Sequence, residues 1–93
     1  MSSGQPLVKV YYFASVRTTL GLSSETLPLP KTPFPLTALI SLIASRYSSL
    51  GAETVFQGCR WSVDNTLIEI EDIAEWTLTG GEEVAAIPPV SGG

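Results

Sequence analysis

The sequence predicts an α+β fold in which a mixed sheet of about five strands packs on one main helix. Two strand-like segments, residues 7–13 and 83–87, lie near the two ends of the chain. Between them, residues 35–48 carry large apolar side chains at the spacing of one helical face. The chain has 93 residues, of which 44% are hydrophobic and 15% charged, which is typical of a single domain with one core.

The first two strands are predicted close to the N-terminus. The segment 7–13, LVKVYYF, has Val8, Val10 and Tyr12 in alternation with other residues, the period-two pattern of a half-buried strand. A second, shorter strand is predicted at residues 25–29, which a glycine precedes and prolines bound. Because proline cannot donate to a sheet, we expect this strand at an edge, antiparallel to the first.

Helices are predicted in two places. Val16 and Leu20 are four residues apart and are followed by a glycine, which indicates one or two helical turns. The main helix is predicted at residues 35–48, where five large side chains fall on one face. These side chains are Leu36, Leu39, Ile40, Ile43 and Tyr47.

The remaining strands are predicted at residues 60–63, 66–70 and 83–87, with an Asp-Asn turn between the first two. The segment 83–87 is apolar on both faces, which favours a central strand. The order strand, strand, helix, strand, strand, strand is that of the ubiquitin-like β-grasp. We expect this domain to span residues 7–87, after a frayed N-terminus of residues 1–6.

Composition argues against several functional classes. The net charge is −4 and the basic residues are scattered, so nucleic-acid binding is not expected. The chain lacks an apolar run of bilayer length and a secretion signal, which predicts a soluble, cytoplasmic protein without membrane contact. Histidine is absent and Cys59 is the single cysteine, so we expect no disulfide, no metal site, no permanently bound cofactor and no histidine-based catalysis. Cys59 is expected to be structural, because no feature of its surroundings would lower its thiol pKa.

The most unusual feature is the C-terminal segment, residues 88–93. Its residues are Pro88, Pro89, Val90, Ser91, Gly92 and Gly93. Proline has a restricted φ and stiffens the exit from the last strand, whereas glycine lacks Cβ, so a narrow channel can close around the end. The segment spans at most about 20 Å at about 3.3 Å per residue, long enough to enter another protein's active site. We interpret residues 88–93 as a flexible carrier tail that inserts into a partner.

The reactive group of this tail is the terminal carboxylate of Gly93. A free carboxylate is a poor electrophile, so a partner enzyme must activate it, and adenylation by ATP supplies the leaving group. The acyl-adenylate could then pass to an amine, which forms an isopeptide bond, or to sulfide, which forms a thiocarboxylate. On this interpretation the domain presents the tail, and the partner enzyme performs the chemistry.

Three segments resemble a known family. VKVYYFASVR at residues 8–17, VDNTLI at residues 63–68 and GGEEVAAIPPVSGG at residues 80–93 resemble the small subunits of molybdopterin synthase, which are β-grasp sulfur carriers. The resemblance covers residues 7–93. The sulfur carrier of the thiamine pathway and the ubiquitin-related modifier share the Gly-Gly end, but they lack the Pro-Pro-Val-Ser segment before it.

The resemblance implies that an activating enzyme of the ubiquitin-activating type adenylates Gly93 and that a sulfurtransferase converts it to a thiocarboxylate. The large synthase subunit then receives the tail, and the sulfur attacks cyclic pyranopterin monophosphate. Two rounds build the dithiolene that later holds molybdenum. The family acts as a heterotetramer of two small and two large subunits, with the catalytic side chains on the large subunit. The alternative is a ubiquitin-like protein modifier that is joined to lysines through Gly93.

Surface candidates follow from the same comparison. Arg17 resembles a residue of the family's short first helix and is a candidate for partner binding, although a solvated charge is the simpler interpretation. Phe13 could join Tyr11, Trp61 and Trp76 in an apolar patch that docks the large subunit. Core positions are expected for most of these aromatic residues, and for Phe13 the two interpretations are even.

The chain departs from the bacterial members of the family at three places. These are an N-terminal extension, prolines at positions 28, 30, 33 and 35, and a longer stretch at residues 53–58. We expect them to alter loops and partner contacts but not the tail. The acidic run at residues 69–75 could meet basic residues of the activating enzyme, and a solvated loop is its other interpretation.

Overall fold

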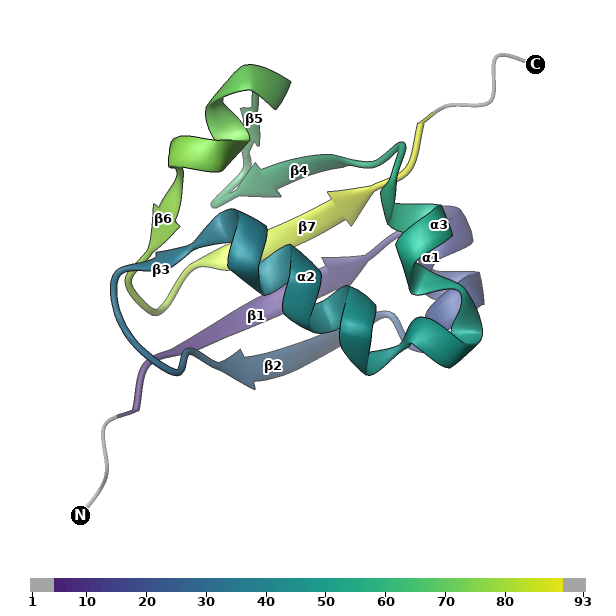
Figure 1. The fold of residues 1–93 in the computed structure, drawn as a ribbon, viewed down its shortest axis with the longest axis horizontal. Coiled ribbons are helices and arrows are strands. Elements are labelled where there is room, and N and C mark those ends of the chain that lie inside the picture. Colours follow the sequence, from purple (N-terminus) through teal and green to yellow (C-terminus); the bar gives the residue numbers. More distant parts are fainter. Residues whose placement is uncertain (1–4, 90–93) are drawn as a thin grey trace.

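The structure, a computed structural model, describes residues 5–89 of the 93. Its main sheet has five strands in the order β2-β1-β7-β4-β5, and α2 crosses one face of it (Figure 1). The strands are β1 Leu7–Tyr12, β2 Ser24–Pro28, β4 Arg60–Val63, β5 Thr66–Ile68 and β7 Glu83–Ile87. β1 and β7 are parallel, whereas the other neighbouring pairs are antiparallel. The predicted mixed sheet of the β-grasp is therefore confirmed.

Alternation along the strands decides which side chains enter the core. Val8, Val10 and Tyr12 of β1 are buried, as their period-two spacing predicts. In β7, Val84 and Ala86 are buried on the same side of the sheet. β7 lies between β1 and β4, which confirms its predicted central position, and β2 lies at an edge, as its prolines indicate.

The main helix, α2 at Leu36–Arg46, closes the core over the sheet. Leu36, Leu39 and Ile43 are at most 1% exposed, and burying each of them contributes about 1.5–3 kcal/mol. Proline at position 35 precedes the first helical residue, where its missing N–H has no cost. The helix ends before the predicted residue 48, because Tyr47 leaves the helical conformation with φ −115° and ψ 29°.

A shorter helix, α1 at Ala14–Leu20, confirms the predicted turns. It buries Val16 and Leu20 and ends at Gly21, which has a left-handed φ of 77° that glycine adopts without steric cost. Before β1, the Leu29 N–H donates to the carbonyl oxygen of Pro6 at 2.9 Å. Hydrogen bonding to the sheet therefore begins within the segment 1–6, of which residues 1–4 lie outside the described residues.

Several short elements were not predicted. They are α3 Ala52–Phe56, the 3₁₀ helices η1 Ser48–Leu50 and η2 Ile70–Glu75, and a two-stranded sheet of β3 Phe34–Pro35 and β6 Thr77–Leu78. The interpretation of residues 53–58 as part of an altered loop was wrong, because most of this stretch is helical and buries Phe56. The predicted strand 66–70 ends at Ile68, where η2 follows. A strand of two residues cannot show alternation, and the short helices have too few turns for their apolar spacing to mark a face.

The predicted Asp-Asn turn joins β4 to β5. Asp64 and Asn65 have φ of 51° and 69°, the left-handed values that two-residue hairpin turns require. Asp64 also binds β7, since its N–H donates to the Glu83 carbonyl at 2.8 Å and its Oδ1 accepts from the Glu83 N–H at 2.9 Å. These bonds hold the tip of the hairpin against the start of the central strand.

Candidate functional site

The tail leaves the domain from a strand that is paired on both sides. β7 is hydrogen-bonded to β1 on one side and to β4 on the other, and its last paired residue is Ile87, opposite Arg60. Pro88 and Pro89 follow, and neither has an N–H with which to extend the ladder. The point from which the tail departs is therefore fixed by the sheet. The predicted tail residues Val90, Ser91, Gly92 and Gly93 lie outside the described residues.

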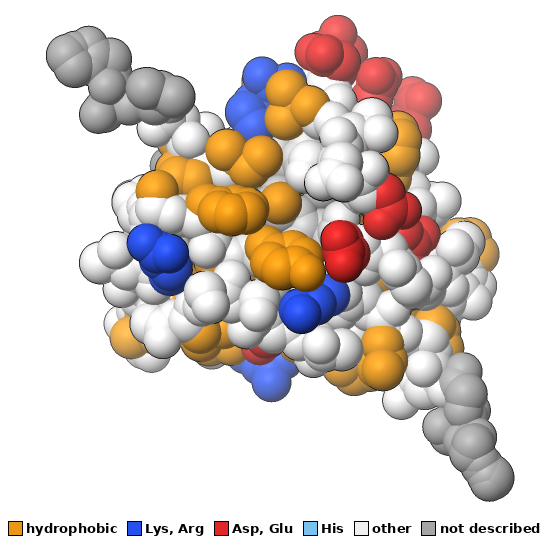
Figure 2. All heavy atoms as spheres, turned by 180° about the vertical axis from the view of Figure 1, so that it is seen from behind, with side chains coloured by type: hydrophobic (Ala, Val, Ile, Leu, Met, Phe, Trp, Pro, Cys, Tyr) orange, Lys and Arg blue, Asp and Glu red, His pale blue; other side chains and the backbone are white. Residues whose placement is uncertain are grey.

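The sheet face opposite α2 is open and largely apolar. Phe13 and Leu67 are 47% and 48% exposed, and Ala85 and Ile87 are half-buried between them. Figure 2 shows a cluster of hydrophobic side chains in the middle of this face. A depression of about 450 Å³ lies on it. Its lining residues are Tyr11, Phe13, Ser62, Asn65, Leu67, Glu83, Ala85 and Ile87.

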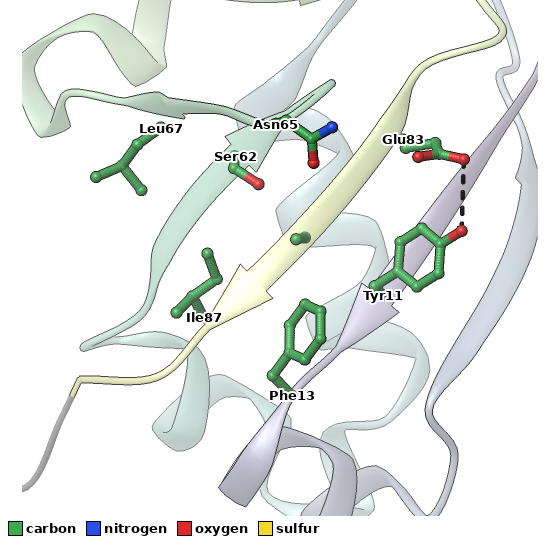
Figure 3. Close-up of a pocket in the computed structure, with 8 residues that line it drawn as sticks. Tyr11, Phe13, Ser62, Asn65, Leu67, Glu83 and Ile87 are labelled. Carbon is green, nitrogen blue, oxygen red and sulfur yellow. Dashed lines mark hydrogen bonds between the residues drawn. The ribbon is translucent and has the colours of Figure 1, made fainter.

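The two ends of this depression differ in polarity (Figure 3). Phe13 and Ile87 lie at the end where β7 stops, beside the start of the tail. Glu83 and Asn65 lie at the other end, where the Tyr11 hydroxyl donates to Oε2 of Glu83 at 3.4 Å. An apolar centre with a polar rim is the usual anatomy of a protein interface. We call the eight lining residues the open face.

Aromatic packing orders part of the open face. The rings of Tyr11 and Phe13 are stacked with centroids 6.5 Å apart, and the Lys9 ammonium lies 5.3 Å from the centroid of the Tyr11 ring. A preordered aromatic pair loses little conformational freedom when a partner covers it. The placement of Phe13 on a surface beside the tail therefore fits the predicted partner contact.

Arg17, the other predicted surface residue, lies on α1 and is exposed. Its backbone N–H donates to the carbonyl of Phe13, so the two candidates belong to one short segment. Within residues 5–89, its guanidinium forms neither an ion pair nor a hydrogen bond. Arg17 can therefore bind an anionic group of a partner without breaking a contact of its own.

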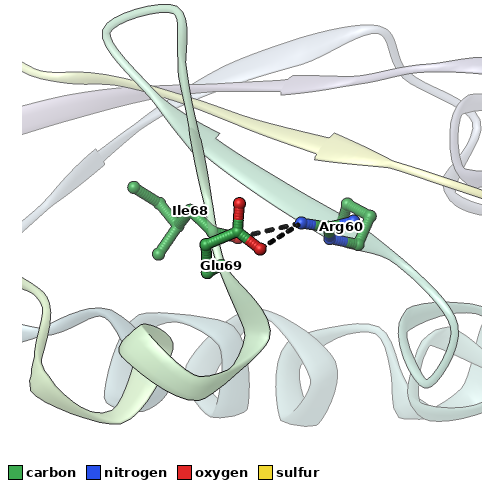
Figure 4. Close-up of polar contacts among 3 residues, drawn as sticks. All are labelled: Arg60, Ile68 and Glu69. Carbon is green, nitrogen blue, oxygen red and sulfur yellow. Dashed lines mark hydrogen bonds and ion pairs between the residues drawn. The ribbon is translucent and has the colours of Figure 1, made fainter.

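Arg60 is a charged residue of this region that sequence reasoning did not select. It stands opposite Ile87 at the start of β4, so its side chain emerges on the open face. Its Nη2 donates to the Ile68 carbonyl at 3.5 Å and lies 3.7 Å from Oε1 of Glu69 (Figure 4). The alternation of residues 60–63 could have identified Arg60 as a surface residue, because it places Arg60 on the opposite face of the strand from the buried Trp61.

The single cysteine is structural. Cys59 is buried, its Sγ donates to the Val55 carbonyl at 3.2 Å, and burial raises the pKa of its thiol. A raised pKa disfavours the thiolate, the form that attacks or transfers sulfur. The prediction for Cys59 is confirmed.

The aromatic residues divide between the two faces of the sheet. Trp61 is buried, and its ring contacts that of Phe56 edge to face with the ring centroids 5.2 Å apart, which confirms its core position. Trp76 is half-buried against the core. Tyr11 and Phe13 belong to the open face instead, because alternation from the buried Tyr12 turns both of them outward.

Two further observations concern the described part of the chain. Between residues 5 and 89, no three cysteine or acidic side chains gather as the ligands of a metal ion would. Over the same range, no helix has the length and apolar character needed to cross a membrane.

Comparisons with known proteins show what this chain is similar to. The ThiS family matches residues 10–93. The molybdopterin synthase sulfur carrier subunit of Mycosarcoma maydis is 71% identical to this chain over 93 residues, and the match covers 100% of both chains. The small archaeal modifier protein 1 from Methanosarcina acetivorans has a TM-score of 0.70 at 23% identity, covering 98% of this chain and 100% of that one. A chain in the complex of subunits 1 and 2 of molybdopterin-converting factor from Helicobacter pylori has a TM-score of 0.54 at 20% identity, covering 94% of this chain and 99% of that one.

The two solved structures support the fold alone, because a modifier and a converting-factor subunit share it at low identity. The relative with 71% identity is more specific, since the match includes the C-terminal segment of both chains. The family match covers the same segment. The chain therefore belongs to the ThiS family and groups there with the molybdopterin synthase sulfur carrier subunits.

Proposed function

We propose that this chain is the sulfur carrier subunit of a molybdopterin synthase and that it carries sulfur as a thiocarboxylate on Gly93. The observation that carries the proposal is the 71% identity with the carrier subunit of Mycosarcoma maydis over the full length of both chains. The fixed exit of the tail from β7 and the open face beside it also support a carrier that a partner enzyme holds.

Loading of Gly93 takes two steps on a partner enzyme. The carboxylate attacks the α-phosphate of ATP, and pyrophosphate leaves, which gives the acyl-adenylate. A sulfur nucleophile delivered by a sulfurtransferase then displaces AMP and leaves a thiocarboxylate at the end of the tail. We place the carrier in the cytoplasm, where ATP for this reaction is present. This chain contributes the acyl group, while the activating enzyme supplies the nucleotide site.

Sulfur donation takes place in the large subunit. The thiocarboxylate sulfur attacks a side-chain carbon of cyclic pyranopterin monophosphate and displaces an oxygen substituent, which leaves with the electron pair of the broken C–O bond. Water then adds to the acyl carbon and cleaves its C–S bond, which leaves sulfur on the pterin and restores the Gly93 carboxylate. Catalytic acids and bases for these steps belong to the large subunit. Within residues 5–89, the single thiol of this chain is buried and histidine is absent, which fits a carrier role.

We infer that the large subunit docks on the open face. This face is apolar at its centre and begins at the residue from which the tail departs, so one partner can hold both. Phe13 and Ile87 would be covered by the partner, and Arg17 would meet an acidic side chain at the rim. Two small subunits would bind in this way at opposite ends of a large-subunit dimer.

The direct test is mass spectrometry of the chain after incubation with its activating enzyme, a sulfurtransferase, ATP and a sulfur source. We expect the C-terminal peptide to gain the mass difference between sulfur and oxygen. The matched control is the chain with one alanine appended after Gly93, which moves the carboxylate but leaves the domain unchanged. An unmodified peptide in the natural chain, under conditions that load an established carrier, would overturn the proposal.

The same samples separate the carrier from a protein modifier. Addition of the large subunit and cyclic pyranopterin monophosphate should return the peptide to its original mass and yield the dithiolene product. A ladder of larger covalent conjugates in cell extract would instead identify a modifier joined to lysines. Light scattering of the mixture should give the mass of two small and two large subunits.

A further inference from the structure

A glycine lies against the start of the tail. Gly58 is exposed in the turn between α3 and β4, and a methyl group placed on its Cα would lie 3.4 Å from Cγ and 3.6 Å from Cδ of Pro89. These are the distances of van der Waals contact. An alanine would therefore fit at this position, whereas a larger side chain directed the same way would occupy the space of the proline ring.

The sheet register explains why these two residues meet. The last pair between β4 and β7 is Arg60 with Ile87. Gly58 lies two residues before Arg60, and Pro89 lies two residues after Ile87. If the antiparallel register is continued past the ends of the two strands, Gly58 falls opposite Pro89. Proline has no N–H, so no ladder hydrogen bond is available to hold it there. Because Gly58 has no side chain, the ring of Pro89 can lie beside it.

The backbone does not require glycine at this position. Among residues 5–89, the glycines with positive φ are Gly21, Gly51, Gly80 and Gly81, whereas Gly58 has a φ outside the left-handed region. The space at position 58, rather than its backbone conformation, therefore limits the size of the residue, and this space admits a methyl group but not a larger side chain directed the same way. The neighbour that would fill this space is Pro89.

The turn that carries Gly58 is fixed to the core. The Gln57 N–H donates to the Thr54 carbonyl at 3.3 Å, and the Cys59 N–H donates to the Phe56 carbonyl at 3.1 Å. Phe56 and Cys59 are buried on either side of the turn. The turn that contains Gly58 is therefore held in place. A large side chain added at position 58 would displace Pro89 before it displaced the turn.

We propose that Gly58 is a positioning residue for the C-terminal tail: because it has no side chain, the Pro89 ring can lie beside it, and a side chain larger than a methyl group would turn the start of the tail away from this turn. The inference rests on the proposed function, since direction matters only if the end of the tail must enter an active site. A displacement of about 1 Å at a reacting group can lower a rate by up to about a hundredfold.

The test compares Gly58→Val with Gly58→Ala in the full-length chain. Valine has two γ-carbons and a stiff χ1, so it cannot turn entirely away from the ring, whereas alanine adds the single methyl that fits. We expect the rate of ATP-dependent adenylation by the activating enzyme to fall about tenfold for Gly58→Val and less than twofold for Gly58→Ala. Thermal unfolding should be unchanged in both, because position 58 is exposed.

A double-mutant cycle with Pro89→Ala identifies the mechanism. Pro89→Ala removes Cγ and Cδ, the atoms that Gly58 faces. Gly58→Val should therefore cause little further loss in the Pro89→Ala background. If valine lowers the rate equally in both backgrounds, it acts on partner docking, and the positioning role is wrong.

A second measurement does not depend on activity. Nuclear Overhauser effects between the Gly58 Hα protons and the Pro89 ring protons should be present in the isolated chain, and their absence would overturn the contact. Loss of the proposed function has a different signature, because the unaltered chain would then not be converted to a thiocarboxylate. If the unaltered chain is active and Gly58→Val is equally active, only the positioning role falls.

Discussion

Truncation of Phe13 tests whether the open face is the docking surface. The side chain is 47% exposed, and a phenylalanine presents about 200 Å² of surface, so a partner can cover about 100 Å² more of it. At about 25 cal/mol per Å², this area corresponds to about 2 kcal/mol, or about a 30-fold rise in Kd for Phe13→Ala. The assay is calorimetric titration of the carrier with the large subunit.

A matched pair of leucines controls for the loss of an exposed apolar side chain. Leu67 on the open face is 48% exposed, and Leu50 on η1, outside the open face, is 49% exposed. Leu67→Ala should weaken binding by about 1 kcal/mol, about half the value of a fully buried leucine, whereas Leu50→Ala should have no effect. Equal affinities for Phe13→Ala and the natural chain would refute the docking surface. A loss for Leu50→Ala alone would place the partner on the helical side.

Three further predictions concern the fold. Leu39→Ala should lower the free energy of unfolding by about 2–5 kcal/mol in urea titrations, because Leu39 is fully buried on the face of α2 that packs on the core. A loss below about 1 kcal/mol would mean that the core relaxes around the cavity. Glu25→Ala should lower the free energy of unfolding by about 1–3 kcal/mol in the same assay, since the carboxylate accepts hydrogen bonds from the hydroxyls of Tyr12 at 2.6 Å and Tyr47 at 2.9 Å and its loss leaves the less exposed Tyr12 hydroxyl unpaired. Glu25→Gln should retain part of this stabilisation. Partial burial of Glu82 acts to raise the pKa of its carboxyl, but hydrogen bonds from backbone N–H groups of its own turn outweigh burial and lower this pKa. The stability that the carboxylate contributes is therefore present above the pKa of the unfolded chain and is lost as the pH falls through the lowered pKa of the folded chain. Thermal unfolding of Glu82→Gln should therefore change less than that of the natural chain between about pH 5 and pH 3, and identical profiles would count against this role.

The long elements were predictable because each contains enough residues to show its period. Alternation in residues 7–13 and the helical spacing in residues 35–48 identified β1 and α2, and both carry much of the core. The pair β3 and β6 has two residues in each strand, so no spacing could reveal it. α3 was missed for the same reason, and its buried Phe56 was mistaken for part of a loop.

The candidate site was predictable in part. The residues of the C-terminal segment suggested the tail and the proposed chemistry of Gly93, because terminal glycines and a stiff proline pair are visible without a fold. Phe13 of the open face was named as a candidate for partner contact. Tyr11 was one of four aromatic residues for most of which a core position was expected, and the structure places it on the open face. Arg60 was missed, because its importance depends on its pairing with Ile87.

The sequence by itself determined the β-grasp order of elements, which follows from local spacing, and its terminal residues are the basis of the proposed role of the tail. The tertiary structure decided which sheet face is left open and where the tail departs from it. It also brought Gly58 against Pro89, residues that are far apart along the chain. Such contacts depend on strand register across the sheet, and register is set by the packing of the whole core rather than by any one segment.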